Sequence, residues 1–117
     1  MVATDYLRRP FTPTPAIAAR VAEIVAFLAD KELSAGERGR LAFAQSRPDP
    51  VAEADALDIA APFYREASRQ IAAELAASDD TADRTYSAFA AERIDTDTPA
   101  EARARFRLLM IQAGSRG

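Results

Sequence analysis

The sequence predicts an all-α fold, a compact bundle of five or six short amphipathic helices behind an extended, proline-containing N-terminal arm. Three observations lead to this expectation. Apolar residues recur at spacings of three and four, capping residues followed by proline open several of these stretches, and no alternating β pattern of useful length occurs. The 117 residues, 49% hydrophobic and 28% charged, suffice for one domain with one core. We therefore expect a single helical domain over residues 14–114, after an arm over residues 1–13.

The arm is predicted from Pro10 and Pro13, because proline favours extended backbone at its own position and at the residue before it. Its aromatic residues, Tyr6 and Phe11, are expected to pack against a surface. That surface belongs either to the same domain or to a partner.

The first helix is expected to begin at Thr14 and Pro15, a capping residue followed by proline at the first helical position. It should continue to about Leu33. Its apolar stripe consists of Ile17, Val21, Ile24, Val25 and Leu28.

A short second helix should follow the capping box formed by Ser34 and Glu37, and the prolines at positions 48 and 50 should end it. We expect this helix to carry three residues toward the core: Leu41, Phe43 and Ala44.

A third helix is expected from Asp49 and Pro50, and Pro62 should kink it, or alternatively break it. Its predicted core face consists of Val51, Ala54, Leu57 or Asp58, and Ala61 before that proline, and of Phe63, Ala67, Ile71 and Leu75 after it.

Two further helices are predicted from caps, one at Ser78-Asp79-Asp80 and one at the capping box of Thr98 and Glu101. A polar loop over residues 95–98 should separate them. The first should turn Ala82, Tyr86, Phe89 and Ala90 toward the core and fade after Ile94. The second should bury Ala102, Phe106, Leu109, Met110 and Ala113 before Gly114 ends it.

The composition argues against several chemistries. The chain has no cysteine and no histidine, so it lacks thiolate and imidazole metal ligands and the side chain most used for acid–base catalysis near neutral pH. We expect no catalysis, no metal site and no cofactor. An apolar run long enough to span a bilayer and a secretory signal pattern are both missing, so we expect a cytoplasmic protein.

Residues 70–89 resemble the helix-turn-helix pattern of DNA-binding proteins, with Ile71 and Leu75 as buried positions of the first helix. The resemblance implies a transcriptional regulator that contacts DNA through Ser78, Thr81 and Arg84. Charge argues against this function, because residues 49–98 contain four basic and twelve acidic residues, a net charge of −8. A segment of that charge is poorly suited to approach a polyanion.

We therefore expect a noncatalytic protein–protein interaction protein, a small adaptor, inhibitor or accessory subunit, with the DNA-binding regulator as the alternative. An alanine-rich chain buries little apolar area per residue, and association with another protein or a second copy would compensate. The expected contacts come from the arm and from an acidic helical face, namely Tyr6, Phe11, Asp55, Asp58, Asp79, Asp80 and Asp83.

Overall fold

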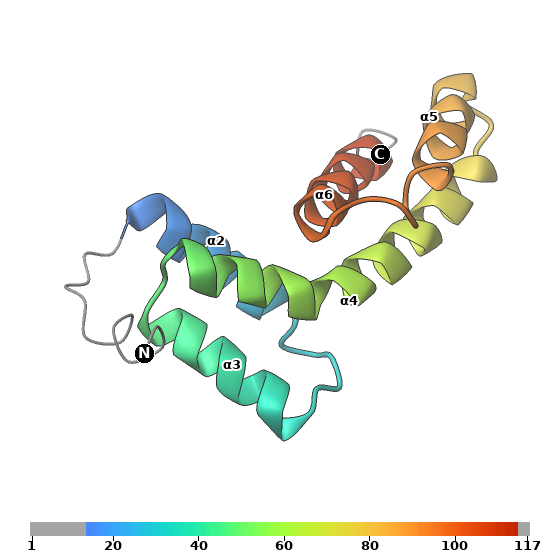
Figure 1. Cartoon of the computed structure of the whole chain (residues 1–117). Coiled ribbons are helices and arrows are strands. Elements are labelled where there is room, and N and C mark those ends of the chain that lie inside the picture. Colours follow the sequence, from blue (N-terminus) through green and yellow to red (C-terminus); the bar gives the residue numbers. More distant parts are fainter. Residues whose placement is uncertain (1–13, 115–117) are drawn as a thin grey trace. The chain divides into compact units, whose positions relative to one another are not determined.

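The structure, a computed structural model, describes residues 14–114 and is all-helical over that range (Figure 1). The predicted all-α class is confirmed for these residues, which contain no strand. Tyr6 and Phe11 of the predicted arm lie outside the described residues. The five helices, labelled as in Figure 1, are α2 (Pro15–Phe27), α3 (Ala35–Ser46), α4 (Pro50–Ala76), α5 (Thr81–Ala91) and α6 (Pro99–Gly114).

The chain divides into two compact units, and the boundary falls inside α4. The N-terminal unit is Met1–Ala56 and the C-terminal unit is Leu57–Gly117. Each unit is described by itself below. The single domain and the compact bundle over residues 14–114 stay predictions.

In the N-terminal unit, α2 begins at Pro15 as predicted but ends at Phe27, six residues before the expected end. Leu28 and Leu33 are both buried, with exposed fractions of 2% and 8%. Five residues turn a helix through about 500°, so these two side chains would point about 140° apart on one continuous helix. Ending the helix at Phe27 lets both reach the core.

The capping box that opens α3 is confirmed. The Ser34 hydroxyl accepts a hydrogen bond from the Glu37 amide at 3.1 Å, and a Glu37 carboxylate oxygen accepts one from the Ser34 amide at 2.9 Å. Leu41 and Ala44 are buried as expected, whereas Phe43 is 42% exposed. Phe43 is two residues from Leu41, about 200° around the helix, so it points away from the face that they share.

Two arginines connect the helical hairpin of α2 and α3 to the first turns of α4. Arg20 pairs with Glu53, and Arg40 pairs with Asp55 through both carboxylate oxygens. All four side chains retain some solvent exposure, so water screens both pairs and each contributes little to stability. The core contributes more, and its buried side chains are Val21, Ile24, Leu28, Leu33, Leu41 and Ala44.

Helix α4 is continuous past Pro62, so the predicted long helix is confirmed and the alternative break is not observed. The Asp49 side chain accepts a hydrogen bond from the Ala52 amide at 2.8 Å, which supports the predicted start. Pro62 itself is exposed. Proline has no backbone N–H, so one carbonyl of the preceding turn lacks its usual helical donor. On the solvent side of a helix, such a carbonyl can tilt outward and accept a hydrogen bond from water, so the helix can continue.

The buried face of α4 differs from the predicted one. Val51, expected in the core, is 63% exposed, and Phe63 is only partly buried. Tyr64 is 1% exposed instead, and its ring lies 5.4 Å from that of Phe106. Alanines fill both possible faces, so the helical period alone did not identify the core side. The buried residues are Ala52, Ala56, Ile59, Ala60, Ala61, Tyr64, Ser68, Ala72 and Leu75.

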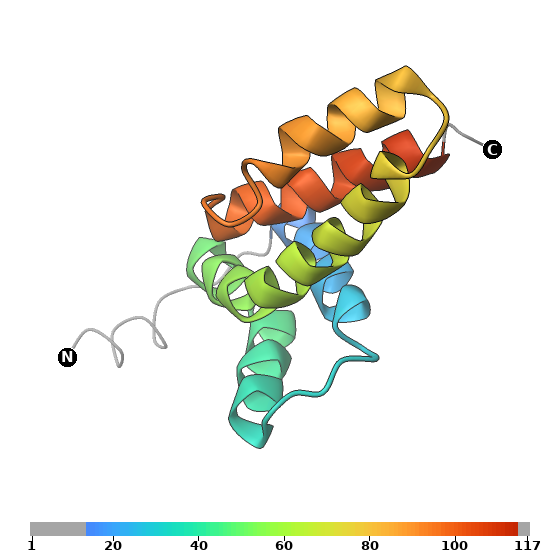
Figure 2. The same ribbon diagram turned by 90° about the vertical axis from the view of Figure 1, so that its right-hand side faces the viewer.

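The C-terminal unit packs the second part of α4 with α5 and α6, and Figure 2 shows α5 running beside α6 in the opposite direction. Leu75, Ala90 and Leu109 form its core, with one side chain from each helix. Three partly buried residues pack against them: Ile71, Tyr86 and Ala113.

Helix α5 begins as predicted, with the Asp80 side chain accepting from the Ala82 amide at 2.9 Å. Its inward face was predicted in part. Ala90 is buried and Tyr86 packs against the core as expected, but Ala82 and Phe89 are exposed, whereas Asp83 and Ser87 are buried. The Ser87 hydroxyl donates to the carbonyl oxygen of Ala72 at 2.6 Å, so a small side chain brings α5 close to α4.

Helix α6 begins at the predicted capping box. The Thr98 amide donates to a Glu101 carboxylate oxygen at 2.9 Å, and the Glu101 amide donates to the Thr98 hydroxyl at 3.2 Å. Ala102 and Leu109 are buried as expected, but Met110 is 51% exposed.

Replacing Leu75 by alanine should lower the free energy of unfolding by about 3 kcal/mol, because the fully buried side chain leaves a cavity among three helices. Met110→Ala, in the same unit but half exposed, should cost less than about 0.5 kcal/mol. Urea unfolding followed by circular dichroism measures both. Equal losses would contradict the core described above.

Candidate protein-interaction site

The acidic residues expected to form one partner-binding face lie in different environments. Asp55 belongs to the N-terminal unit and pairs with Arg40. Asp58, Asp79 and Asp80 belong to the C-terminal unit and are exposed. Asp80 also caps α5, so one of its carboxylate oxygens is already in use.

Asp83 is the exception, because its side chain lies inside the C-terminal unit and is 0% exposed. The Ser78 hydroxyl donates to one carboxylate oxygen at 2.6 Å, and the Gln112 amide donates to the other at 2.7 Å. Asp83 therefore connects the turn before α5 to α6. Asp83 is therefore unavailable to a partner, and the expectation that it belongs to an exposed acidic face is wrong.

The three residues proposed to contact DNA form a local network. The Arg84 guanidinium donates to the Ser78 carbonyl oxygen at 2.8 Å and to the Thr81 hydroxyl at 3.1 Å. Thr81 and Arg84 are exposed and Ser78 is partly buried. The Arg84 side chain thus folds back over the turn before α5.

The contacts between α4 and α5 identify an antiparallel helical hairpin. Ser78 bonds to Asp83, Ser87 to the carbonyl of Ala72, and Arg69 to Asp95 at 2.6 Å. Residues earlier in α4 thus bond to residues later in the chain, so α5 runs back along α4. Ser87–Ala72 is the hydrogen bond here that joins the two helices directly, and a hollow of about 390 Å³ lies between them beside it.

Asp97, in the loop before α6, holds two arginines. Arg105 donates to both of its carboxylate oxygens, at 3.0 and 3.2 Å, and Arg65 donates to its backbone carbonyl at 2.8 Å. The hydrogen bond from Asp97 is the main cause that raises the pKa of Arg105 above its ordinary value. The Arg105 charge is therefore compensated inside the unit.

Large apolar side chains of α5 and α6 are exposed. Phe89 is 46% exposed, Leu108 50% and Ile111 67%. We call these three residues the α5–α6 apolar surface. Beside it lies a hollow of about 540 Å³, whose walls are Ala82, Thr85, Tyr86, Phe89 and Gln112.

The Phe89 ring is held between other side chains. The guanidinium carbon of Arg93 lies 3.6 Å from the ring centroid and that of Arg105 lies 5.5 Å from it, and the Tyr86 ring centroid is at 6.3 Å. Cations over an aromatic face attract its negative charge distribution. These contacts therefore stabilise the position of the ring within the unit.

Sequence reasoning placed Phe89 and Met110 in the core and missed this surface. A signal was present in the run Leu108-Leu109-Met110-Ile111, because four consecutive residues of a helix point in four directions. Only Leu109 among them is buried. Such a run leaves apolar side chains outside the core, because a helix in a small unit buries one face.

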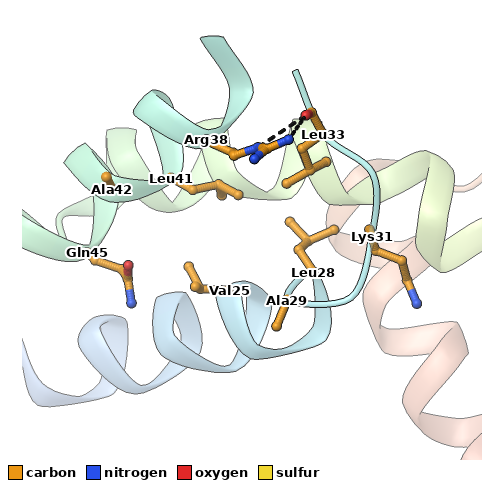
Figure 3. Close-up of a pocket in the computed structure, with 9 residues that line it drawn as sticks. All are labelled: Val25, Leu28, Ala29, Lys31, Leu33, Arg38, Leu41, Ala42 and Gln45. Carbon is orange, nitrogen blue, oxygen red and sulfur yellow. Dashed lines mark hydrogen bonds between the residues drawn. The ribbon is translucent and has the colours of Figure 1, made fainter. Parts of the chain in front are cut away.

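The N-terminal unit contains a separate hollow of about 300 Å³, shown in Figure 3. Its walls are mainly aliphatic, and Arg38 stands at its edge, donating to the Leu33 carbonyl oxygen at 2.8 and 3.2 Å. Lys31 points away from the other lining side chains and pairs with Asp30 at 3.1 Å. The lining residues are Val25, Leu28, Ala29, Lys31, Leu33, Arg38, Leu41, Ala42 and Gln45.

Comparison with known proteins adds no relative: no protein-family model, no curated protein and no solved structure matches this chain. Within residues 14–114, no helix combines the length and the apolar character needed to cross a membrane. The same residues contain no cluster of three or more acidic, histidine or cysteine side chains arranged to hold a metal ion.

Asp83→Ala should lower the free energy of unfolding by about 2–3 kcal/mol, because the Ser78 hydroxyl and the Gln112 amide would each lose a buried acceptor. Asp79→Ala, four residues earlier and exposed, should change it by less than about 0.5 kcal/mol. Thermal and urea unfolding test the pair. A neutral Asp83→Ala would show that the buried carboxylate does not stabilise the unit.

Proposed function

We propose that this protein acts without catalysis by binding another protein molecule, as a small adaptor, inhibitor or accessory subunit, and that the α5–α6 apolar surface is its contact. The exposure of Phe89, Leu108 and Ile111 carries this proposal. Large apolar side chains left exposed on two packed helices are residues that an interface with another protein would bury.

The energetics support a contact at this place. Half-exposed Phe, Leu and Ile side chains together offer roughly 300 Å² of apolar area, and burial contributes about 25 cal/mol per Å². Aromatic and arginine side chains are also the residues enriched at the energetic centres of interfaces. Phe89, flanked by Arg93 and Arg105, has that composition, and these contacts stabilise its position.

The acidic residues have a smaller part in this proposal than the sequence suggested. Asp79 and Asp80 remain exposed at the N-terminus of α5, where they can form a polar rim. Asp83 is buried and Asp55 is paired within its own unit, so neither is included.

We also propose that the protein is not an enzyme and that it is cytoplasmic. The first rests on a sequence without histidine or cysteine. A DNA-binding regulator remains the alternative, and the net charge of −8 over residues 49–98 argues against it.

Affinity capture from an extract treated with nuclease tests the function. The wild-type protein should retain a protein at near-equal amount, and Phe89→Ser should lose it, because the central aromatic contact is removed. Val51→Ser is the control, since Val51 is 63% exposed on α4 and its variant should retain the partner. Capture that is equal in both variants would contradict the proposed surface, and capture that disappears with nuclease would favour the DNA-binding alternative.

A further inference from the structure

We infer that the hollow of the N-terminal unit binds a small aliphatic carboxylate, with the carboxylate on Arg38 and the hydrocarbon chain against the aliphatic walls. This hollow is the one in Figure 3, with a volume of about 300 Å³. Its walls come from α2, from α3 and from the segment between them. The inference therefore goes beyond the proposed function and does not depend on the α5–α6 apolar surface.

Aliphatic side chains form the floor of the hollow. Leu28, Leu33 and Leu41 are all buried, with exposed fractions of 2%, 8% and 6%. Val25 and Leu28 point from the α2 side toward Leu41 of α3 (Figure 3). Among the described residues, no acidic side chain lines the hollow. The hollow therefore suits a hydrocarbon chain and does not repel an anion.

Arg38 supplies a cation that no carboxylate neutralises within residues 14–114. Its Nε and Nη2 donate to the Leu33 carbonyl oxygen at 3.2 and 2.8 Å, and no further hydrogen bond or ion pair joins its guanidinium to the described residues. The carbonyl group is neutral, so it holds the guanidinium in place without compensating its charge. Arg38 is thus a positioned cation at the edge of an aliphatic hollow.

The geometry of the guanidinium specifies the chemical class of the ligand. The bonds to Leu33 use the edge formed by Nε and Nη2. Nη1 and Nη2 form another edge, whose donors match the two oxygens of a carboxylate. Lys31, the second cation of the lining, pairs with Asp30 at 3.1 Å and points away from the other lining side chains. The expected ligand therefore has a single carboxylate and a hydrocarbon chain.

The size of the hollow limits the length of that chain. Ligand pockets have volumes of roughly 300–1,000 Å³, so this hollow lies at the lower limit. Arg38 is also exposed, so water and salt screen its attraction for an anion. We therefore expect a short-chain carboxylate such as hexanoate to bind with a Kd on the order of millimolar.

NMR titration of the isotope-labelled full-length protein with hexanoate tests the site. The amide signals of Ala29, Leu33 and Ala42 should shift with one common Kd, because these residues surround the ligand. Butanoate should bind at least about tenfold more weakly, since it buries two fewer methylene groups. Hexanamide, which has the same chain and no charge, should also bind at least about tenfold more weakly.

Variants of two arginines test the role of the guanidinium. Arg38→Gln should weaken hexanoate binding at least about tenfold and leave hexanamide binding within about twofold, because only the carboxylate needs the cation. Arg84→Gln is the control. Arg84 also donates to a backbone carbonyl, that of Ser78 at 2.8 Å, but it belongs to the C-terminal unit, so both Kd values should stay within about twofold.

A third variant tests the hollow without changing charge. Ala42 is exposed on α3 and lines the hollow, so Ala42→Phe should fill the space and weaken both hexanoate and hexanamide at least about tenfold. Circular dichroism confirms that each variant is folded.

Four outcomes overturn the inference. Acetate could reproduce the shifts at the same concentration, which would show an anion effect that needs no hydrocarbon chain. The shifts could fall outside the residues of the hollow, or Arg38→Gln could leave the hexanoate Kd unchanged. Signals of the hollow could also shift with protein concentration alone, which would make a second copy of the chain its occupant.

Discussion

The buried carboxylate of Asp83 sets the rotation of two helices, and most of the C-terminal unit depends on it. Its hydrogen bonds reach Ser78 before α5 and Gln112 on α6. With Asp83 turned inward, Phe89, six residues later and about 240° around the helix, must turn outward. With Gln112 turned toward Asp83, Leu109 enters the core, and Leu108 and Ile111 remain at the surface. The apolar surface proposed as the contact is thus a consequence of a polar interaction inside the unit.

Small side chains make this arrangement possible. Ser87 and Ala72 allow α4 and α5 to approach until the hydroxyl of one meets the carbonyl oxygen of the other at 2.6 Å. The hydrogen bond satisfies a buried hydroxyl that would otherwise destabilise the unit. The Ser87–Ala72 and Arg69–Asp95 contacts turn α5 back along α4 as a hairpin, although the segment also matches a helix-turn-helix pattern. An alanine-rich sequence matches both arrangements, and the polar contacts select one of them.

The helix starts could be predicted from the sequence because each depends on a few adjacent residues. The Ser34–Glu37 and Thr98–Glu101 capping boxes and the Asp80 cap form within one turn of their helices. The buried faces could not be predicted as well. In α4, alanines fill the faces on both sides of Tyr64, so the spacing of apolar residues did not indicate which face is inside. In α5, the pattern favoured Phe89 over Asp83, because a charged residue is rarely fully buried without partners.

By itself, the sequence determined the all-helical class, the places where helices begin and the absence of thiol and imidazole chemistry. Tertiary structure decided which face of each helix is buried, and so which residues remain for a partner. The physical reason is the range of the interactions. A cap is completed within four residues, whereas the acceptor of the Gln112 amide lies 29 residues away along the chain, and only folding brings the two together.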